Sequence, residues 1–316
     1  YTDRRYGGYS DRVKEKYIEA LIEGEDIEEH FAVREKEPLR EYSKGWFFKL
    51  VVGDKTGNMT LVYWGGADKD EVEAIYNTIK VSDVIRVKGA VSIYKGDLQI
   101  YINKEEFHGL SKLSEDEYDI DDYMPRTEKD IDGMLSELRE SAEKVEDENL
   151  KSLLDMFLDD EEFTGSLKKS PYSKSYNNNY IGGLLEHILN DVKMASYATE
   201  LYPELDRDLL LTAAIVHDFG KVEEYITEAS IGLTTESRMI GHTVLCERIV
   251  KEKIDMMDGF PNDLAMKLSH IILSHHGDYE WGSARSPRME EAVVLHHIDL
   301  LDVRLSGFLQ AKKELS

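Results

Sequence analysis

Residues 213–221 read Ala-Ala-Ile-Val-His-Asp-Phe-Gly-Lys, an apolar helical run that ends in polar side chains. The adjacent His217 and Asp218 are costly there, because a buried imidazole and a buried carboxylate must each find a partner. A divalent metal ion would serve both, although a structural polar contact would also satisfy the pair. Eight of the ten histidines fall between positions 187 and 297, and this clustering favours a metal site.

Three predicted helices carry the remaining candidates for a first metal ion. His187 lies early in a helix predicted over 181–201, the His-Asp pair ends a helix predicted over 208–219, and Asp299 lies in a helix predicted over 289–305. Four nitrogen and oxygen donors from three helices can enclose one divalent ion. The metal-ligand candidates of this first site are therefore His187, His217, Asp218 and Asp299.

A second ion is predicted beside the first. His242, and His275 at the end of a helix predicted over 263–276, would hold it together with a bridging Asp218. Two such ions suit the hydrolysis of phosphate esters. Lys221 follows Asp218 by three residues and would contact a phosphate, so Asp218 and Lys221 are the candidate catalytic residues.

The type of ligand limits the choice of metal. The single cysteine excludes a cysteine-rich structural zinc site, and mixed histidine and aspartate ligation indicates Mn²⁺ first, with Fe, Co or Mg as alternatives. His276 and His297 are candidate additional ligands or supports of ligands. His270 and His296 fit the site less well and are predicted to be structural.

In the N-terminal half, the residue pattern is that of β-strands. Residues 46–52, 59–64, 84–91 and 98–102 are rich in β-branched and aromatic residues and are separated by glycine-containing turns, and 70–79 has the pattern of a short helix. This order predicts a small Greek-key barrel of the OB type. The predicted fold class is therefore multidomain α+β, with an N-terminal β-barrel followed by an all-α domain.

Such a barrel would bind single-stranded nucleic acid through aromatic rings that stack on bases and cationic side chains that contact phosphates. Trp46, Phe48, Trp64 and Tyr94 are the candidates for base stacking. About half of the barrel's aromatic residues are expected to face its core instead, because strand residues alternate between the two faces.

The predicted domain boundaries follow composition. Residues 1–26 form an N-terminal segment with a short amphipathic helix over 10–23, 27–110 the barrel, 111–126 an exposed acidic linker, and 127–316 a domain that is helical throughout. Of the net charge of −25, residues 111–162 carry six Lys/Arg against twenty Asp/Glu, whereas 39–110 carry ten of each. The acidic excess therefore leaves a local basic groove open, although it equally fits a general role in solubility.

Two loops of the second half are candidate substrate contacts. Residues 164–180 are polar, contain Lys174 and Asn178, and lead into His187. Trp281 and Arg285 follow the pair His275-His276 and would hold a terminal base by stacking and a phosphate by charge. Plain surface loops would explain both stretches as well.

Several short sequence motifs around these residues resemble those of a known family. They are Gly-Gly-Leu-Leu-Glu-His (182–187), Val-His-Asp-Phe-Gly-Lys-Val-Glu-Glu (216–224), Ile-Gly-His (240–242), Leu-Ser-His-His-Gly-Asp-Tyr-Glu-Trp-Gly-Ser (273–283) and Leu-His-His-Ile-Asp-Leu-Leu-Asp (295–302). They resemble the HD-domain phosphohydrolases, and within them the YhaM-type 3′-to-5′ exoribonucleases. That family joins an OB-fold to an HD domain, the architecture predicted above.

The resemblance implies Mn²⁺-dependent removal of nucleotides from the 3′ end of single-stranded RNA, with some activity on single-stranded DNA. By position, His187, His217, Asp218 and Asp299 match the first-metal ligands, and His242 and His275 match the second-metal positions. The chain departs from the family at residues 177–179, where three asparagines replace a frequent His-His pair. Asparagine can hydrogen-bond a phosphate but cannot act as an acid.

We therefore predict a metal-dependent 3′-to-5′ exonuclease whose partner is single-stranded nucleic acid, RNA before DNA. The alternatives are an HD-domain nucleotide or cyclic-nucleotide phosphohydrolase and a non-catalytic nucleic-acid-binding adaptor. No apolar run is long enough to cross a bilayer, so we expect a cytoplasmic protein without membrane partners. A homo-oligomer remains open.

Overall fold

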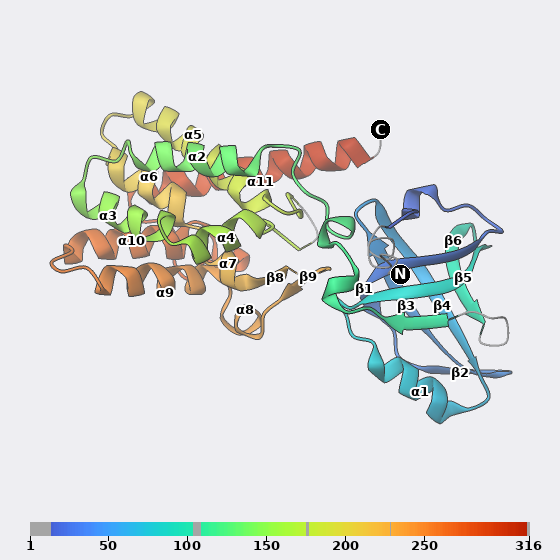
Figure 1. Cartoon of the computed structure of the whole chain (residues 1–316). Helices are drawn as coiled ribbons and strands as arrows, with labels where there is room; N and C mark the ends of the chain where they lie inside the picture. The colour runs from blue at the N-terminus through green and yellow to red at the C-terminus, as the bar shows by residue number, and fades with distance from the viewer. Residues whose placement is uncertain (1–13, 104–108, 175–176, 228, 315–316) are drawn as a thin grey trace, which may run out of the picture. The chain divides into compact units, whose positions relative to one another are not determined.

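The computed structural model describes residues 14–103, 109–174, 177–227 and 229–314. The chain forms two compact units, one of residues 1–125 with 228–231 and one of residues 126–227 with 232–316. Figure 1 shows the first unit built mainly of strands and the second mainly of helices. Among the described residues, no helix is long and apolar enough to cross a membrane.

The first unit is a closed barrel. Its strands are β1 (Asp26–Lys36), β2 (Arg40–Tyr42), β3 (Gly45–Asp54), β4 (Gly57–Gly66), β5 (Val84–Tyr94), β6 (Asp97–Asn103) and β7 (Gly109–Lys112), with helix α1 (Lys69–Thr78) between β4 and β5. The sheet runs in the order β1-β3-β4-β6-β5 and closes by pairing β5 with β1, while β4 and β6 pair in parallel. This is the five-stranded OB topology, so the predicted strands and their Greek-key order are confirmed.

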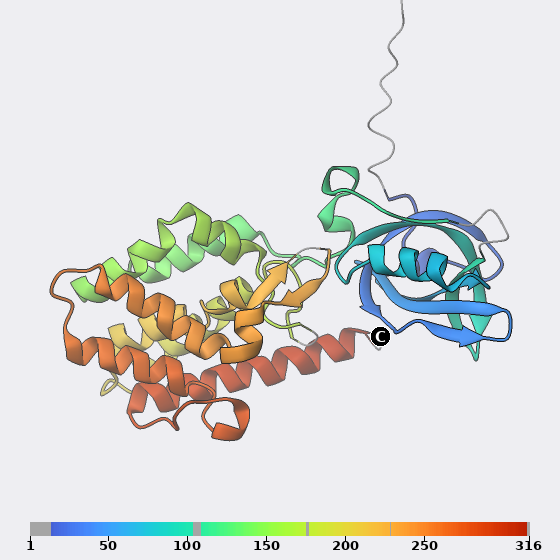
Figure 2. The same ribbon diagram turned by 90° about the horizontal axis from the view of Figure 1, so that it is seen from below.

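Alternation along the strands builds the barrel core. Phe48, Leu50 and Val52 of β3 are fully or almost fully buried, and Leu61, Ile85, Ile100 and Ile102 join them. Helix α1 contacts β3 and β4, and Figure 2 shows it as the cyan helix in front of the barrel. Its N-cap Asp68 accepts a hydrogen bond from the Glu71 amide, which satisfies a donor that the first turn leaves free.

The N-terminal helix predicted over 10–23 is wrong where the structure describes it. Only Ile18–Ala20 are helical, as a 3-10 turn, and residues 10–13 lie outside the described residues. The buried ammonium of Lys14 donates to the carbonyl of His30 and lies 3.6 Å from the Asp54 carboxylate. Ile18 and Leu21 pack on the barrel core, so tertiary contacts override the helical pattern.

The segment predicted as an exposed linker is packed on the barrel. Leu113, Tyr123 and Met124 are buried, and short 3-10 helices at Glu115–Glu117 and Ile120–Asp122 separate them. Most of the acidic residues face water, Asp122 accepts a hydrogen bond from the Tyr17 hydroxyl, and three apolar side chains anchor the segment. The spacing of these three buried residues matches neither a helical nor a strand period, so the sequence pattern did not reveal that they are buried.

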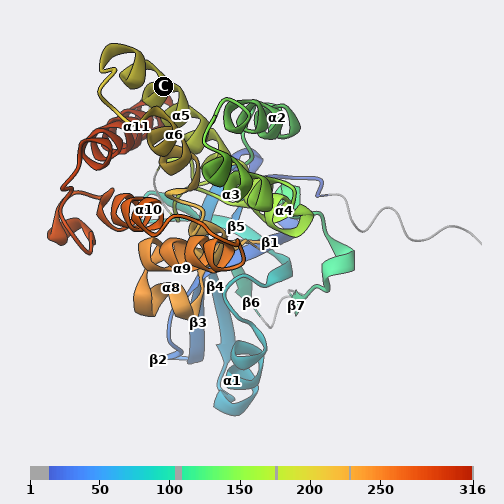
Figure 3. The same cartoon turned by 90° about the vertical axis from the view of Figure 1, so that its left-hand side faces the viewer.

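The second unit is a helical bundle. Its helices are α2 (Ile131–Ala142), α3 (Glu148–Leu158), α4 (Glu161–Lys169), α5 (Gly183–Leu201), α6 (Arg207–Val216), α7 (Lys221–Glu224), α8 (Thr235–Ile240), α9 (His242–Asp255), α10 (Asn262–Ser274) and α11 (Glu290–Glu314), with a 3-10 turn at Tyr279–Trp281. Figure 3 looks at this unit and shows α5 beside α11 and α9 beside α10. The expectation of helices throughout misses one hairpin, β8 (Tyr225–Thr227) with β9 (Ile231–Leu233).

Part of the acidic charge has a structural use. Asp130, Asp147, Asp160 and Asp206 are the N-caps of α2, α3, α4 and α6, and each side chain accepts hydrogen bonds from amides of the first turn. A carboxylate at this end also meets the positive end of the helix dipole. Three of the four lie in the most acidic stretch of the sequence, so local helix chemistry explains some of its composition.

Candidate metal centre

Five histidines from four helix ends or turns converge inside the second unit. His187 lies in the second turn of α5, His217 is the C-cap of α6, His242 begins α9, and His275 and His276 end α10. All but His242 and His276 are fully or almost fully buried. The helix-end prediction for His217 and His275 is therefore confirmed by the local structure.

Backbone carbonyls fix three of the five rings through their Nδ1 atoms. The Nδ1–H groups of His217, His275 and His276 donate to the carbonyls of Ala214, Ile272 and Trp281 at 3.0, 2.7 and 2.9 Å. Because each Nδ1 is engaged in this way, the neutral ring presents the lone pair of its Nε2 to the interior.

Carboxylates orient the other two rings. Nδ1 of His187 lies 2.7 Å from the Asp302 carboxylate, and Nδ1 of His242 lies 3.4 Å from that of Glu224. Asn190 donates to the second oxygen of Asp302 at 2.9 Å. A carboxylate behind a histidine fixes the ring and increases its basicity as a metal ligand. Sequence reasoning missed the supporting roles of Asp302 and Glu224.

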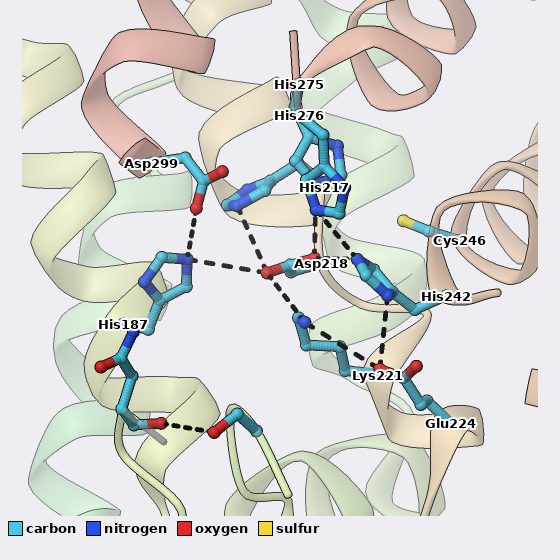
Figure 4. Close-up of polar contacts among 12 residues, drawn as sticks. His187, His217, Asp218, Lys221, Glu224, His242, Cys246, His275, His276 and Asp299 are labelled. Atoms are coloured by element: carbon cyan, nitrogen blue, oxygen red, sulfur yellow. Dashed lines mark hydrogen bonds and ion pairs between the residues drawn. The ribbon is translucent and has the colours of Figure 1, made fainter. Parts of the chain in front are cut away.

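Asp218 divides its two oxygens between two groups of histidines. Its Oδ2 lies 3.6 Å from Nε2 of His187 and 3.7 Å from Nε2 of His217, whereas its Oδ1 lies 3.5 Å from His242 and 3.7 Å from His275. Figure 4 shows Asp218 between His187 with Asp299 on one side and His242 on the other. The predicted bridging position of Asp218 thus has a geometric basis.

The first group contains a residue that the sequence analysis did not name. Ligand atoms of His187, Asp191, His217 and Asp299 all lie within 4.8 Å of one another, and all four residues are buried. Asp191 follows His187 by one helical turn, so it faces the same side of α5. The spacing His-x₃-Asp on a predicted helix was the signal that could have found it.

The second group consists of His242, His275 and His276. The Nε2 atoms of His242 and His276 are 3.2 Å apart. Burial, and next the neighbouring His242, lower the pKa of His276 to about 4, so its ring is neutral at physiological pH. His276 therefore belongs with the second group.

The protonation pattern follows from burial and charge. Burial lowers the pKa of His217 to about 4 and that of His275 well below its usual value. Burial also opposes protonation of His187, but the carboxylates around it, Asp191 first, raise its pKa to about 9. Asp218 stays ionised, because Lys221 and the histidines outweigh its burial and hold its pKa well below the usual range.

The residues present fit a metal ion. Among the described residues, no hydrogen-bond partner reaches Nε2 of His187, His217 or His275, either oxygen of Asp191 or Asp218, or Oδ1 of Asp299. Buried polar atoms of folded proteins normally have partners, so a set of orphaned ligand atoms pointing at one another fits a bound cation. Imidazole nitrogens and carboxylate oxygens without thiolates suit Mn²⁺, Fe²⁺, Co²⁺ or Mg²⁺.

Lys221 lies at the edge of the cluster. Its ammonium is 3.9 Å from the carboxylates of Asp218 and Glu224 and 4.4 Å from the centre of the Tyr172 ring. Both ion-pair distances exceed a hydrogen bond, so N–H groups remain available for a phosphate oxygen.

The asparagines at 177–179 support the loop before α5. Asn177 and Asn178 adopt φ of 48° and 50°, left-handed values that asparagine tolerates better than most residues. The Asn178 side chain accepts from the Tyr180 hydroxyl at 2.9 Å, and Asn179 accepts from Gln310 at 2.9 Å. Asn178 is buried, which corrects its prediction as a substrate contact.

Close packing explains the two glycines that start α5. A Cβ on Gly183 would lie 2.0 Å from the Asn178 carbonyl oxygen, and Gly182 has φ of 84°. The loop therefore packs directly against the turn that carries His187, and the Tyr172 ring lies 4.1 Å from the His187 ring. Lys174 is exposed on the same loop.

A cavity of about 200 Å³ opens beside Asp299, lined by Tyr172, His276, Trp281, His296, Asp299, Leu300 and Val303. Trp281 is half-exposed, and the Arg304 guanidinium lies 6.0 Å from its ring. Arg285 is exposed and is not among the lining residues, whereas Arg304, which the sequence analysis missed, is the cation next to Trp281.

The three histidines of the helical unit outside the cluster are His270, His296 and His297, of which the first two make structural hydrogen bonds and the third is exposed. His270 accepts from the Arg288 amide at 3.0 Å, and His296 donates to the His275 carbonyl at 2.7 Å, which agrees with the structural roles predicted for them. His297 is exposed and lines a surface hollow with Leu301 and Arg304, so its prediction as a ligand or ligand support is wrong. Two positions along a helix turn the side chain by about 200°, which places His297 on the opposite side of α11 from the buried Asp299.

The barrel carries an aromatic surface cluster of Tyr42, Phe47 and Trp64. The Phe47 and Trp64 rings stack with centroids 4.9 Å apart, and Tyr42 lies 4.8 Å from Trp64. Phe48, one residue along, is fully buried, so its prediction as a base-stacking residue is wrong, whereas Phe47 is only partly buried. The period of two along β3 decides between them.

The two other predicted stacking residues differ in setting. Trp46 packs partly against the barrel core with the Lys69 ammonium 5.1 Å from its ring. Tyr94 is exposed at the β5–β6 turn, where Lys95 and Gly96 adopt φ of 56° and 99°, and the Lys95 ammonium lies 5.4 Å from its ring.

Comparisons with known proteins agree with both units. The HD domain family matches residues 184–304, and the OB-fold nucleic acid binding domain family matches residues 32–107. The 3′-5′ exoribonuclease YhaM of Bacillus subtilis (strain 168) is 26% identical over 285 residues, which are 90% of this chain and 86% of that protein. The YhaM proteins of Listeria innocua and Shouchella clausii are 29% and 28% identical, over 82% of this chain and 79% and 78% of theirs.

Among solved structures, the p204 HINb domain aligns with 32% of this chain and 47% of its own, at a TM-score of 0.24 and 14% identity, too low to bear on the fold. The YhaM proteins instead align across both the barrel and the helical unit, in the same order along the chain. The chain therefore contains an OB-fold nucleic acid binding domain followed by an HD domain, and it is similar over most of its length to the YhaM-type 3′-5′ exoribonucleases.

Proposed function

We propose that the protein is a metal-dependent exonuclease that removes nucleotides from the 3′ end of single-stranded RNA. The relatives named 3′-5′ exoribonuclease YhaM support the direction and the substrate class. The donor set supports a divalent metal, with Mn²⁺ as the first choice and two ions per chain.

One observation supports the chemistry above all others, the division of the two Asp218 oxygens between two sets of unpartnered histidine nitrogens. A single carboxylate shared in this way is what a pair of neighbouring cations needs as a bridge. When bound, two divalent cations supply an activated water and neutralise the charge that builds up on the phosphoryl oxygens.

The chain's own residues prepare the site for that chemistry. The backbone carbonyls and carboxylates behind the five rings fix the tautomers and aim each Nε2 inward. Lys221 holds its ammonium beside Asp218, where it would bind a phosphate oxygen of the substrate. Tyr172 and its loop shield the His187 side of the cluster from water.

Two features support binding of a single strand. The cavity beside Asp299 offers the half-exposed Trp281 as a stacking surface for the terminal base, and Arg304 as a cation for a phosphate. On the barrel, Tyr42, Phe47 and Trp64 offer a second aromatic surface. A stacked base must be unpaired, so we expect duplex RNA to be resistant.

The test uses a single-stranded RNA labelled at its 5′ end, with Mn²⁺. Wild type should give a descending ladder of products, and the same RNA labelled at its 3′ end should release labelled mononucleotide at once. Asp218→Asn and EDTA should each abolish both results, whereas Glu200→Gln, an exposed substitution on α5, should not.

The same preparation should be offered free nucleotides and cyclic nucleotides. Hydrolysis of these with intact RNA would refute the exonuclease and support a nucleotide phosphohydrolase. RNA binding without any hydrolysis by a metal-loaded protein would instead support the adaptor.

A further inference from the structure

Asp191 is fully buried in α5 and has no assigned role in the four-ligand set of His187, His217, Asp218 and Asp299. It is one turn beyond His187, and the two side chains enter the bundle from the same face of the helix.

Neither oxygen of Asp191 has a hydrogen-bond partner among the described residues. Its Oδ2 lies 3.5 Å from Nε2 of His187 and 3.6 Å from Nε2 of His217, which are themselves unpartnered. Nδ1 of His217 bonds the Ala214 carbonyl, so its neutral ring turns the Nε2 lone pair toward the carboxylate, and His187, whose Nδ1 bonds Asp302, points its Nε2 into the same space. Lone pairs and a carboxylate repel one another unless a cation lies among them.

The Lys221 ammonium does not supply a cation next to Asp191. Among the described residues, Lys221 forms its ion pairs with Oδ2 of Asp218 and with Glu224, at 3.9 Å each, and none joins it to Asp191. A buried carboxylate without a hydrogen-bond partner is strongly unfavourable, and a bound cation would stabilise it.

We propose that Asp191 is a fifth ligand of the first metal ion, beside His187, His217, Asp218 and Asp299. This deepens the proposed function, because it rests on the same metal centre. The site then has three carboxylates and two imidazoles instead of two of each. A donor set richer in oxygen favours Mn²⁺ or Mg²⁺ over Zn²⁺, and the additional negative charge strengthens binding of the ion.

The experiment measures metal binding to the full chain without RNA. Mn²⁺ is titrated into metal-free wild type, Asp191→Asn, Asp191→Ala and the α5 control Glu200→Gln, by calorimetry and by the loss of the free Mn²⁺ electron paramagnetic resonance signal. We expect Asp191→Asn to reduce the affinity for one of the two Mn²⁺ ions at least tenfold and to leave the affinity for the other unchanged. The ratio of Mn²⁺ affinity to Zn²⁺ affinity should fall.

Melting temperatures separate a ligand from a structural residue. Without metal, Asp191→Asn replaces a buried carboxyl group that has no hydrogen-bond partner among the described residues, so the variant should melt at the same temperature as wild type or higher, while the increase caused by Mn²⁺ shrinks. A lower melting temperature without metal, together with wild-type Mn²⁺ affinity, would overturn the proposal. Circular dichroism confirms folding, and Asp191→Ala provides a second variant without an amide that could still coordinate.

The outcomes distinguish this proposal from the exonuclease. A wild type that binds Mn²⁺, loses affinity on Asp191→Asn and leaves RNA intact supports the ligand and refutes the exonuclease. A wild type that degrades RNA while Asp191→Asn keeps full Mn²⁺ affinity refutes the ligand alone. A wild type that binds no divalent metal refutes both.

Discussion

Replacing Gly220 by alanine should move His242, a ligand candidate of the second group, away from Asp218. A Cβ at this position would lie 2.3 Å from the His242 carbonyl oxygen and 2.4 Å from the Cys246 amide nitrogen. Both atoms belong to the backbone of α9, which cannot rotate away as a side chain would. Ordinary contact begins near 3.4 Å, so α9 and the Asp218 turn must move apart by about 1 Å.

The displacement acts on one group of ligands. His242 begins α9, and its Nε2 lies 3.5 Å from Asp218, whereas His187 and Asp299 lie on α5 and α11. We therefore expect Gly220→Ala to bind one Mn²⁺ per chain instead of two. A misplacement of about 1 Å can cost about 100-fold in rate, and overpacking costs about 1–3 kcal/mol of stability.

Calorimetric Mn²⁺ titration, RNA degradation rates and urea unfolding measure these three effects. Gly165→Ala is the matched control, because Gly165 lies within α4 and a Cβ there meets nothing within 4 Å. It should leave metal binding unchanged and add up to about 1 kcal/mol of stability. Two Mn²⁺ ions bound by Gly220→Ala with wild-type affinity would refute the reasoning.

Three further predictions test other parts of the chain. Asp302→Ala removes the carboxylate that lies 2.7 Å from Nδ1 of His187, so calorimetry should show Mn²⁺ affinity reduced about 10- to 100-fold; unchanged affinity would contradict the supporting role. Phe48→Ala should destabilise the barrel by about 3–5 kcal/mol in urea, whereas Phe47→Ala should mainly weaken RNA binding, by about 1–3 kcal/mol in a filter-binding assay; the reverse pattern would reject the surface assignment. Burial lowers the pKa of His30 from 6.5 to about 4, so between these values the unfolded chain binds a proton that the folded barrel does not, and stability should fall as the pH drops from 6.5 to 4. The loss should reach about 2–3 kcal/mol by tryptophan fluorescence in urea and should shrink in His30→Gln; an equal slope in both proteins would argue against His30.

Most of the metal centre was predictable because its ligands stand out chemically against an apolar background. His217 and Asp218 interrupt a buried run, and four further ligand candidates, His187, His242, His275 and Asp299, lie in or beside predicted helices of the same half. Asp191 shows the limit of that reasoning. It lies between Asn190 and Val192 in a helix of mixed composition, so its position alone does not reveal that it is fully buried.

The order of strands likewise follows from local chemistry. β-branched residues and glycine turns mark the strands of the barrel, and both are encoded within a few residues. The stretch around Lys14 and Ile18 behaves differently, because its helical pattern loses to contacts with Asp54 and the barrel core, which lie far away in the sequence.

By itself, the sequence determined that a strand-rich half precedes a helical half, and that histidine and aspartate ligands end or interrupt the helices of the second. These are properties of residue type and short-range period. Tertiary structure alone decided which side chains share an interior: Phe47 outside and Phe48 inside, His276 in the cluster and His297 outside it, and Asp191 beside His187 and His217. The reason is physical, since a small rotation of a strand or helix moves a side chain from water to the core, and only the packing of distant elements fixes that rotation.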